Sequence, residues 1–299
     1  MGHHRKQLEY GNIRITDKLF GEYVQKVSEK IIPHQWKILN DQLEDSEPTY
    51  CIQNFRVAAG ELPGERKGVV FQDTDLYKWL ESVAFCIAGG QGREYEALAD
   101  DVIELVGRAQ ETDGYLNTYY TVNEPDKKWS NLVEGHELYT AGHMIEAAVA
   151  YYQATGKTKI LNIARKNADL ICRVFGTGEG QKKGYPGHQE IELALVKLYR
   201  VTGEKQYLDT ASYFLHERGK RLSLIHISEA KLFFTGDGRQ RRLGIFPGVQ
   251  KLRSGIFTIT YRTGKAEDSG RACGKSHVYV LRHGRPGCGM RGHRDAGSL

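Results

Sequence analysis

The chain has 299 residues, which is enough for one large domain or two small ones with a buried core. It is 40% hydrophobic and 26% charged, as is usual for soluble globular proteins, and no run of 18 apolar residues exists, which excludes a membrane-spanning helix. The formal net charge of +5 averages two unlike regions, because residues 221–299 carry fifteen basic and five acidic side chains whereas residues 1–220 carry an acidic excess.

The N-terminal segment is polar and lacks the apolar stretch of a secretory signal, so we expect a cytoplasmic protein. Residues 10–16 alternate like a short strand. Asp17 is a suitable N-cap for a helix with apolar residues every four positions, and Pro33 is expected to interrupt this helix before a second piece. Residues 41–68 contain prolines and several glycines, and their composition predicts a loop.

Apolar residues at helical spacing predict helices over the rest of the first 220 residues. The connections between them are short enough for antiparallel neighbours, apart from a tyrosine-rich loop over 111–130. The predicted helices cover about 74–88, 93–110, 136–154, 158–174, 189–201 and 205–217. The body of the protein is therefore predicted to be all-α and built from helical hairpins.

Two of these hairpins share a sequence pattern. One helix follows Gly135-His136-Glu137 and ends before Thr155-Gly156, and the other follows Gly187-His188-Gln189-Glu190 and ends before Thr202-Gly203. From the Thr-Gly pairs onward the two copies stay in register at a separation of 47 residues. Such a repeat predicts stacked hairpins, and the matched histidines indicate a shared site.

Residues 221–299 show no helical periodicity and include 13 glycines. Residues 249–263 could form a hairpin, but we identify no partner sheet for it. We expect a domain over 10–220 followed by an irregular tail over 221–299, which is either disordered or of chimeric origin. A basic tail can bind nucleic acid, but this glycine-rich composition makes a nucleic-acid partner the weaker hypothesis.

His136, Tyr139, His143 and Glu146 fall on a face of their helix that is distinct from its apolar stripe, and this polar face could line a central cavity. His136 and His188 lie at predicted helix starts, where the helix dipole favours a neutral imidazole. A neutral ring offers one donor and one acceptor, which suits a sugar hydroxyl. Alternatively, each ring caps its helix or bonds a backbone carbonyl.

Gln72 and Asp73 open another helix. Asp73 is expected to be its N-cap, and the alternative is that both side chains face the cavity. The aromatic residues of the 111–130 loop could stack on a sugar ring or pack on helix ends. The five cysteines show no paired spacing, and His136 and His143 are two turns apart, so no metal site is predicted from spacing.

An ordered set of motifs closely resembles the N-terminal part of the β-L-arabinofuranosidases of glycoside hydrolase family 127. The motifs are Ile31-Ile32-Pro33-His34-Gln35-Trp36, Ala58-Ala59-Gly60-Glu61-Leu62, the segment Val70 to Glu81, Ala109-Gln110, Asp113-Gly114-Tyr115-Leu116, Gly135 to Tyr139, and Gly187 to Leu195. The resemblance implies an (α/α)₆ barrel followed by β-sandwich domains. It also implies retaining hydrolysis by a cysteine nucleophile and a glutamate acid/base, with zinc held by cysteines and a glutamate.

In this resemblance His136 and His188 match the sugar-contacting histidines, and we include Gln72 and Asp73 as further candidate substrate-binding residues. The likeness covers about residues 10–219, and the catalytic glutamate, the zinc-binding glutamate and the cysteine cluster of the family lie beyond that point. Cys273 and Cys288 are therefore not assigned as zinc ligands or nucleophile.

The resemblance implies an incomplete (α/α)₆ barrel, a truncated fragment that holds part of an L-arabinofuranoside pocket. We expect the fragment to be inactive, with no catalytic residue and no zinc ligand. One side of the cavity should be open, with exposed apolar flanks. The alternative is a non-catalytic α-helical carbohydrate-binding or scaffold module. The sequence does not predict the oligomeric state.

Overall fold

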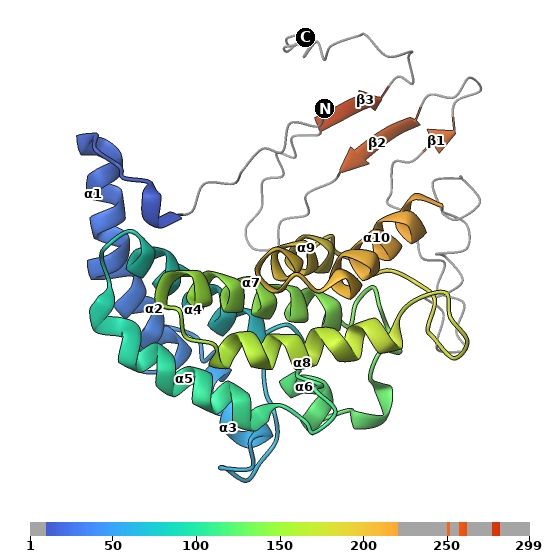
Figure 1. Ribbon diagram of the computed structural model, residues 1–299, viewed down its shortest axis with the longest axis horizontal. Helices are drawn as coiled ribbons and strands as arrows, with labels where there is room; N and C mark the ends of the chain where they lie inside the picture. The colour runs from blue at the N-terminus through green and yellow to red at the C-terminus, as the bar shows by residue number, and fades with distance from the viewer. Residues whose placement is uncertain (1–9, 221–249, 252–256, 262–276, 282–299) are drawn as a thin grey trace, which may run out of the picture. The chain divides into compact units, whose positions relative to one another are not determined.

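The computed structural model describes residues 10–220, 250–251, 257–261 and 277–281. The chain divides into two compact units, Met1–Arg221 and Leu222–Leu299. The described part of the first unit consists of helices and loops (Figure 1). This confirms the all-α prediction for that part.

The predicted helices of the first unit are present in the predicted order, and α3 and α6 lie in segments that were predicted to be loops. The longer ones are α1 (Lys18–Lys26), α2 (Ile32–Leu39), α3 (Cys51–Ala58), α4 (Asp73–Ala88), α5 (Glu96–Ala109), α7 (Glu137–Thr155), α8 (Lys159–Val174), α9 (Ile191–Thr202) and α10 (Lys205–Gly219). Short elements are η1 (Tyr10–Asn12), η2 (Val27–Ile31), η3 (Arg93–Tyr95), α6 (Thr118–Val122) and η4 (Pro125–Lys127).

The long helices form two layers. One layer contains α4, α7 and α9, with α7 packed against both of the others, and the second contains α5, α8 and α10, each in contact with its neighbour. In the view of Figure 1, α5 and α8 lie below α4 and α7. Consecutive helices alternate between the layers, as α7·α8 and α9·α10 do. This is the arrangement expected for part of an (α/α) barrel.

The two repeats adopt the same geometry at their ends. Helices α7 and α9 are followed by Gly156 and Gly203, each with a φ of 75°. The amide of Gly156 donates to the carbonyl of Tyr152, and that of Gly203 donates to Tyr199. The Thr-Gly pairs of the repeat therefore predicted where α7 and α9 end, in addition to predicting the two hairpins.

The apolar stripe of α7 is part of the core. Leu138, Ala141, Ile145 and Ala148 are at most 2% exposed. The polar face is covered to different extents, because Glu146 is buried whereas His136, Tyr139 and His143 are half-buried.

The N-terminal segment differs from the prediction in three places. Residues 10–16 contain the 3-10 turn η1 and no strand. Pro33 does not interrupt the helix, because the π-helical turn η2 precedes it and places it in the first turn of α2, where no amide hydrogen is required. The predicted loop over 41–68 contains helix α3. Asp17 is the N-cap of α1 as predicted, and its Oδ1 accepts from the Phe20 amide at 2.8 Å.

Three strands are described in the second unit: β1 (Gln250–Lys251), β2 (Phe257–Tyr261) and β3 (His277–Leu281). They form an antiparallel sheet in the order β1-β2-β3. The expectation that a hairpin over 249–263 lacks a partner sheet is therefore wrong, since β3 pairs with β2 along its whole length. The sequence His277-Val-Tyr-Val-Leu281 is rich in residues that favour strands. The prediction that residues 221–299 are disordered or of chimeric origin concerns a segment that lies largely outside the described residues.

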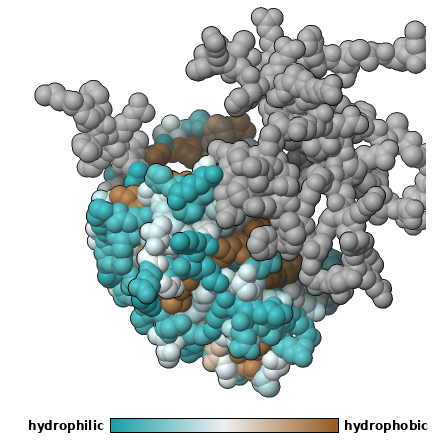
Figure 2. Space-filling view, turned by 90° about the vertical axis from the view of Figure 1, so that its right-hand side faces the viewer, coloured by the Kyte–Doolittle hydropathy of each residue, from teal (hydrophilic) through white to brown (hydrophobic). Residues whose placement is uncertain are grey.

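Large apolar side chains are exposed on several helices, as expected for a barrel that is open on one side. Figure 2 shows a largely hydrophilic face broken by apolar patches. The most exposed large apolar side chains on the described helices are Leu19, Phe20 and Tyr23 on α1, at 60%, 60% and 57% exposed, followed by Leu215 on α10 at 54%. Among the described helices, none is long and apolar enough to span a bilayer.

Candidate sugar-binding site

The two glycine–histidine motifs meet in space because both glycines allow close backbone contact. The Gly187 amide donates to the Leu132 carbonyl at 2.9 Å, and a Cβ at Gly187 would lie 2.5 Å from the Val133 carbonyl oxygen. The segment before His188 is thereby held against the loop that leads to His136. The ring centroids of His136 and His188 are 4.9 Å apart, although the residues are 52 positions apart in the sequence.

Aromatic side chains surround the histidine pair. The centroid of the Phe71 ring lies 5.0 Å from that of His136, and the Tyr139 ring lies 5.1 Å from that of His188. Phe71 is exposed and Tyr139 half-buried. The result is a group of four rings, Phe71, His136, Tyr139 and His188, that offers flat apolar faces together with imidazole nitrogens. Such a mixture suits a ligand that has both C–H faces and hydroxyl groups.

The ring of His136 is oriented by its own backbone. His136 is the residue before α7 and has a φ of 55°, a left-handed conformation that is uncommon for a side chain of this size. Its Nδ1 lies 2.5 Å from the Glu134 carbonyl oxygen, which can only accept, so Nδ1 carries the hydrogen. In the neutral ring, Nε2 is then the acceptor that remains for a ligand hydroxyl. The hydrogen bond to a backbone carbonyl, which was the alternative to a sugar contact, is therefore present at His136, and the sugar contact stays a prediction.

His188 lies in a bend three residues before α9, not at the helix start, because α9 begins at Ile191 and not near residue 189. The prediction that a helix dipole favours a neutral imidazole therefore applies to His136 alone. His188 is exposed, and its ring contacts come from His136 and Tyr139.

Asp73 is not the N-cap of α4. The helix begins at Asp73 itself, and its carboxylate accepts from the Thr118 amide at 2.7 Å and from the Thr118 hydroxyl at 2.5 Å. The guanidinium of Arg66 lies 3.8 Å away, and both side chains are buried. Gln72 is also buried, and its amide donates to Asp75 at 2.6 Å. The structure brings these two side chains into internal contacts, and their predicted substrate contacts remain a prediction.

The 111–130 loop packs on helix ends, which was one of the two alternatives. Tyr115 is buried, and its ring contacts Trp129 edge to face at 5.2 Å. The Tyr115 hydroxyl donates to the Glu137 carboxylate at 2.5 Å, and the Trp129 amide donates to both oxygens of that carboxylate. Glu137 is the first residue of α7 and follows His136 directly. The loop therefore anchors the helix start that carries the site.

Burial raises the pKa of Glu137 from 4.5 to about 7. Between these values the unfolded chain releases a proton that the folded chain keeps, so stability falls as pH rises through this range and then levels off. We expect wild-type protein to lose roughly 1–3 kcal/mol of unfolding free energy between pH 4.5 and 8 through this group. Glu137→Gln should reduce that loss, as measured by urea unfolding at both pH values. Glu192→Gln removes another buried carboxylate and should leave the loss unchanged. Equal pH dependence in wild type and Glu137→Gln would contradict the assignment.

A second polar layer lies next to the four rings and is formed by α7, α9 and the residue before α9. The centroid of the His143 ring is 4.6 Å from that of Tyr139, and His143 Nδ1 is 3.3 Å from Oε1 of Glu190. Glu146 is buried one turn further along α7 and pairs with Lys197 of α9. Burial raises the pKa of Glu190 to about 8, with the neighbouring Glu146 adding to the effect, and burial lowers that of His143 to about 4.

Sequence analysis placed His143 and Glu146 on the polar face of α7 but missed Glu190 and Lys197. Glu190 belongs to the motif Gly187-His188-Gln189-Glu190. Its position two residues after His188 could have indicated that it lies near the site.

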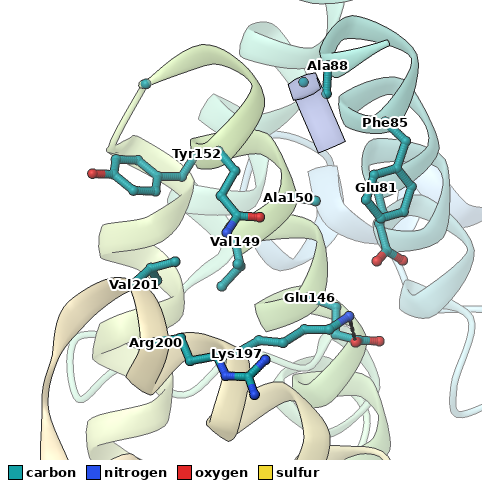
Figure 3. Close-up of a pocket in the computed structure, with 13 residues that line it drawn as sticks. Glu81, Phe85, Ala88, Glu146, Val149, Ala150, Tyr152, Lys197, Arg200 and Val201 are labelled. Atoms are coloured by element: carbon teal, nitrogen blue, oxygen red, sulfur yellow. Dashed lines mark hydrogen bonds and ion pairs between the residues drawn. The ribbon is translucent and has the colours of Figure 1, made fainter. Parts of the chain in front are cut away.

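A groove of about 510 Å³ continues from this layer between α4, α7 and α9. Figure 3 shows Glu146 joined to Lys197 on one side of the groove and Glu81 on α4 across from them. Phe85, Val149 and Tyr152 supply apolar parts of its wall. The four-ring group does not line this groove, so the two features are neighbours on the same layer of helices.

The described cysteines do not fit the zinc centre that the family resemblance implies. Cys51 is buried and donates to the Gln72 carbonyl, Cys86 is buried on α4, and Cys172 accepts from Thr210. Burial raises the pKa of all three thiols. Within the described residues, the one place where three metal-binding side chains converge is His143, Glu146 and Glu190, with no cysteine among them. Cys273 and Cys288 lie outside the described residues.

Comparisons with known proteins agree with the fold. A family model described as the GH127 catalytic domain of β-L-arabinofuranosidase matches residues 12–251. A non-reducing end β-L-arabinofuranosidase of Bifidobacterium longum subsp. longum is 41% identical over 225 residues, which cover 70% of this chain and 34% of that protein.

Two solved structures are also similar. A GH127 β-L-arabinofuranosidase from Geobacillus stearothermophilus T6 has a TM-score of 0.69 and 55% identity over 73% of this chain and 35% of its own. Another GH127 β-arabinofuranosidase has a TM-score of 0.64 and 39% identity over 72% of this chain and 34% of its own. The chain thus spans about a third of the length of these relatives.

Proposed function

Because the chain belongs to glycoside hydrolase family 127, we propose that its four-ring group forms part of the pocket that binds the sugar of a β-L-arabinofuranoside. The observation that carries the proposal is the contact between the rings of His136 and His188, which come from two matched sequence motifs. The ligand class comes from the relatives, whose names state β-L-arabinofuranosidase activity.

The chemistry of the group agrees with this ligand. In the neutral ring of His136, Nε2 is the acceptor, so a hydroxyl of the sugar can donate to it. The Phe71 and Tyr139 rings offer surfaces for the C–H faces of a furanose. The described residues contain no cysteine beside these rings to act as a nucleophile, and we propose that bond cleavage requires residues outside the described part of the chain.

The test is a titration of the protein with methyl β-L-arabinofuranoside, followed by the NMR signals of its histidine side chains. We expect saturable shifts of the His136 and His188 signals at millimolar ligand. Both His136→Ala and His188→Ala should weaken binding at least tenfold, whereas His34→Ala, which removes an exposed histidine on α2, should not. We also expect no hydrolysis of an aryl β-L-arabinofuranoside.

Binding that survives both substitutions would place the sugar elsewhere and contradict the proposal. Hydrolysis that persists in a protein purified without metal would show that the chain carries its own catalytic residues. Binding of unrelated sugars with equal affinity would favour the alternative of a general carbohydrate-binding module.

A further inference from the structure

We propose that His143, Glu146 and Glu190 form a binding site for one divalent transition-metal ion of the zinc class. The proposal does not depend on the arabinofuranoside pocket. It concerns different donors from the cysteine-containing centre that the family resemblance implies.

The geometry of the three side chains suits a single ion. His143 and Glu146 are three positions apart on α7 and so lie on one face of the helix, and Glu190 precedes α9, which packs on that face. One ligand atom from each side chain lies within 4.8 Å of the other two. Ligand atoms around zinc at bond lengths of about 2.0–2.2 Å lie roughly 3–3.5 Å apart, so small side-chain rotations bring the three together.

Unsatisfied polar atoms provide a second, independent observation. Both ring nitrogens of His143 and Oε1 of Glu190 are buried without a hydrogen-bond partner. His143 Nδ1 and Glu190 Oε1 approach to 3.3 Å but do not form a hydrogen bond. Buried polar atoms without partners are costly in a folded protein. An ion bound between the two side chains would satisfy one ring nitrogen of His143 and Oε1 of Glu190.

Helix packing keeps this arrangement in place. A Cβ at Gly142 would lie 2.6 Å from Cγ of Glu190 and 3.2 Å from the Ile191 amide nitrogen. The glycine therefore lets α9 approach α7 closely enough for Glu190 to reach His143. The donor set, one imidazole and two carboxylates, leaves a fourth position open, and Glu146 also lines the groove, which offers a path for the ion.

Two lysines, Lys197 and Lys78, lie near the three proposed metal-binding side chains. Lys197 pairs with Glu146, and Lys78 donates to the Tyr139 hydroxyl at 3.1 Å. An ion at the site would compete with Lys197 for Glu146. Lys197 and Glu81 line the same groove, so Glu81 provides another carboxylate for the displaced ammonium group (Figure 3).

The experiment uses Co²⁺ and Zn²⁺ with the full chain. We expect one Co²⁺ to bind per chain with visible absorption bands of a low-coordinate site, and Zn²⁺ to displace it. His143→Ala and Glu190→Gln should each weaken Co²⁺ binding at least tenfold. Glu190→Gln is nearly isosteric and tests the site even if His143→Ala does not fold, which circular dichroism would show.

Two controls separate this site from other metal-binding groups. Glu192→Gln removes a buried carboxylate of α9 that pairs with Arg218, and it should leave Co²⁺ binding unchanged. The sequence also has adjacent histidines at positions 3 and 4, and the double variant His3→Ala/His4→Ala should keep the absorption bands. Absence of a stoichiometric ion, binding unchanged by both His143→Ala and Glu190→Gln, or binding lost only in the His3/His4 variant would overturn the proposal.

Discussion

Asp73→Ala should lower the free energy of unfolding by about 3–5 kcal/mol, because it leaves a buried charge without its partner. The Arg66 side chain is fully buried and faces Asp73. The two hydrogen bonds that Thr118 donates to the Asp73 carboxylate would also be lost. Urea denaturation followed by circular dichroism measures the effect.

Two further variants test the reason for this loss. Asp75→Ala removes an exposed carboxylate from the same helical turn and should cost about 1 kcal/mol or less. Replacing both buried charged side chains with apolar ones, in Arg66→Met/Asp73→Leu, should recover most of the free energy of unfolding that Asp73→Ala loses, because no unpaired charge remains. If Asp73→Ala costs no more than Asp75→Ala, the buried pair does not stabilise the fold.

Gly114→Ala should lower the free energy of unfolding by about 4 kcal/mol, because it adds backbone strain and a steric clash that cost roughly 1–3 kcal/mol each. Gly114 has a φ of 100°, which strains any residue with a side chain. A Cβ there would also lie 2.4 Å from the Lys166 carbonyl oxygen of α8, a backbone atom that cannot move without shifting the helix. The turn carries Tyr115, so the anchor of α7 should loosen as well.

Gly156→Ala is the matched control for this substitution. Gly156 also has a positive φ, of 75°, but no atom lies within 4 Å of a Cβ built there. It should therefore cost only the backbone strain, about 1 kcal/mol. Thermal unfolding of both variants measures the difference, and equal losses would mean that the contact with Lys166 has no effect.

The long helices could be predicted from sequence because their apolar periodicity is strong and the repeat fixes their ends. Helix α3 could not, since it is short and one of its buried residues is polar: Asn54 bonds the Lys67 backbone in both directions. A buried polar residue weakens the amphipathic pattern of a helix. The hydrogen-bond partner of Asn54 lies in a loop thirteen positions away, where the pattern does not show it. Propensity and pattern describe local structure, and this helix depends on a non-local contact.

The same distinction applies to the site. The histidine pair could be predicted because both members share a motif, and His143 and Glu146 because they share a helix face. Asp73 seemed a helix cap because its partner Thr118 lies 45 positions away, where no local rule connects them. Glu190 belonged to the second motif, but its proximity to His143 depends on how closely α9 approaches α7 at Gly142.

The alternation of helices between two layers has a consequence for the order of assembly. The hairpin α9–α10 and the pairs α7–α8 and α7–α9 join segments that are close along the chain, so they can form early and rapidly. The extensive contact of α4 with α7 must instead close over the whole segment between Ala88 and Glu137. We therefore expect docking of α4 to be the slow step of folding, with core substitutions on α4 retarding refolding more than those on α10.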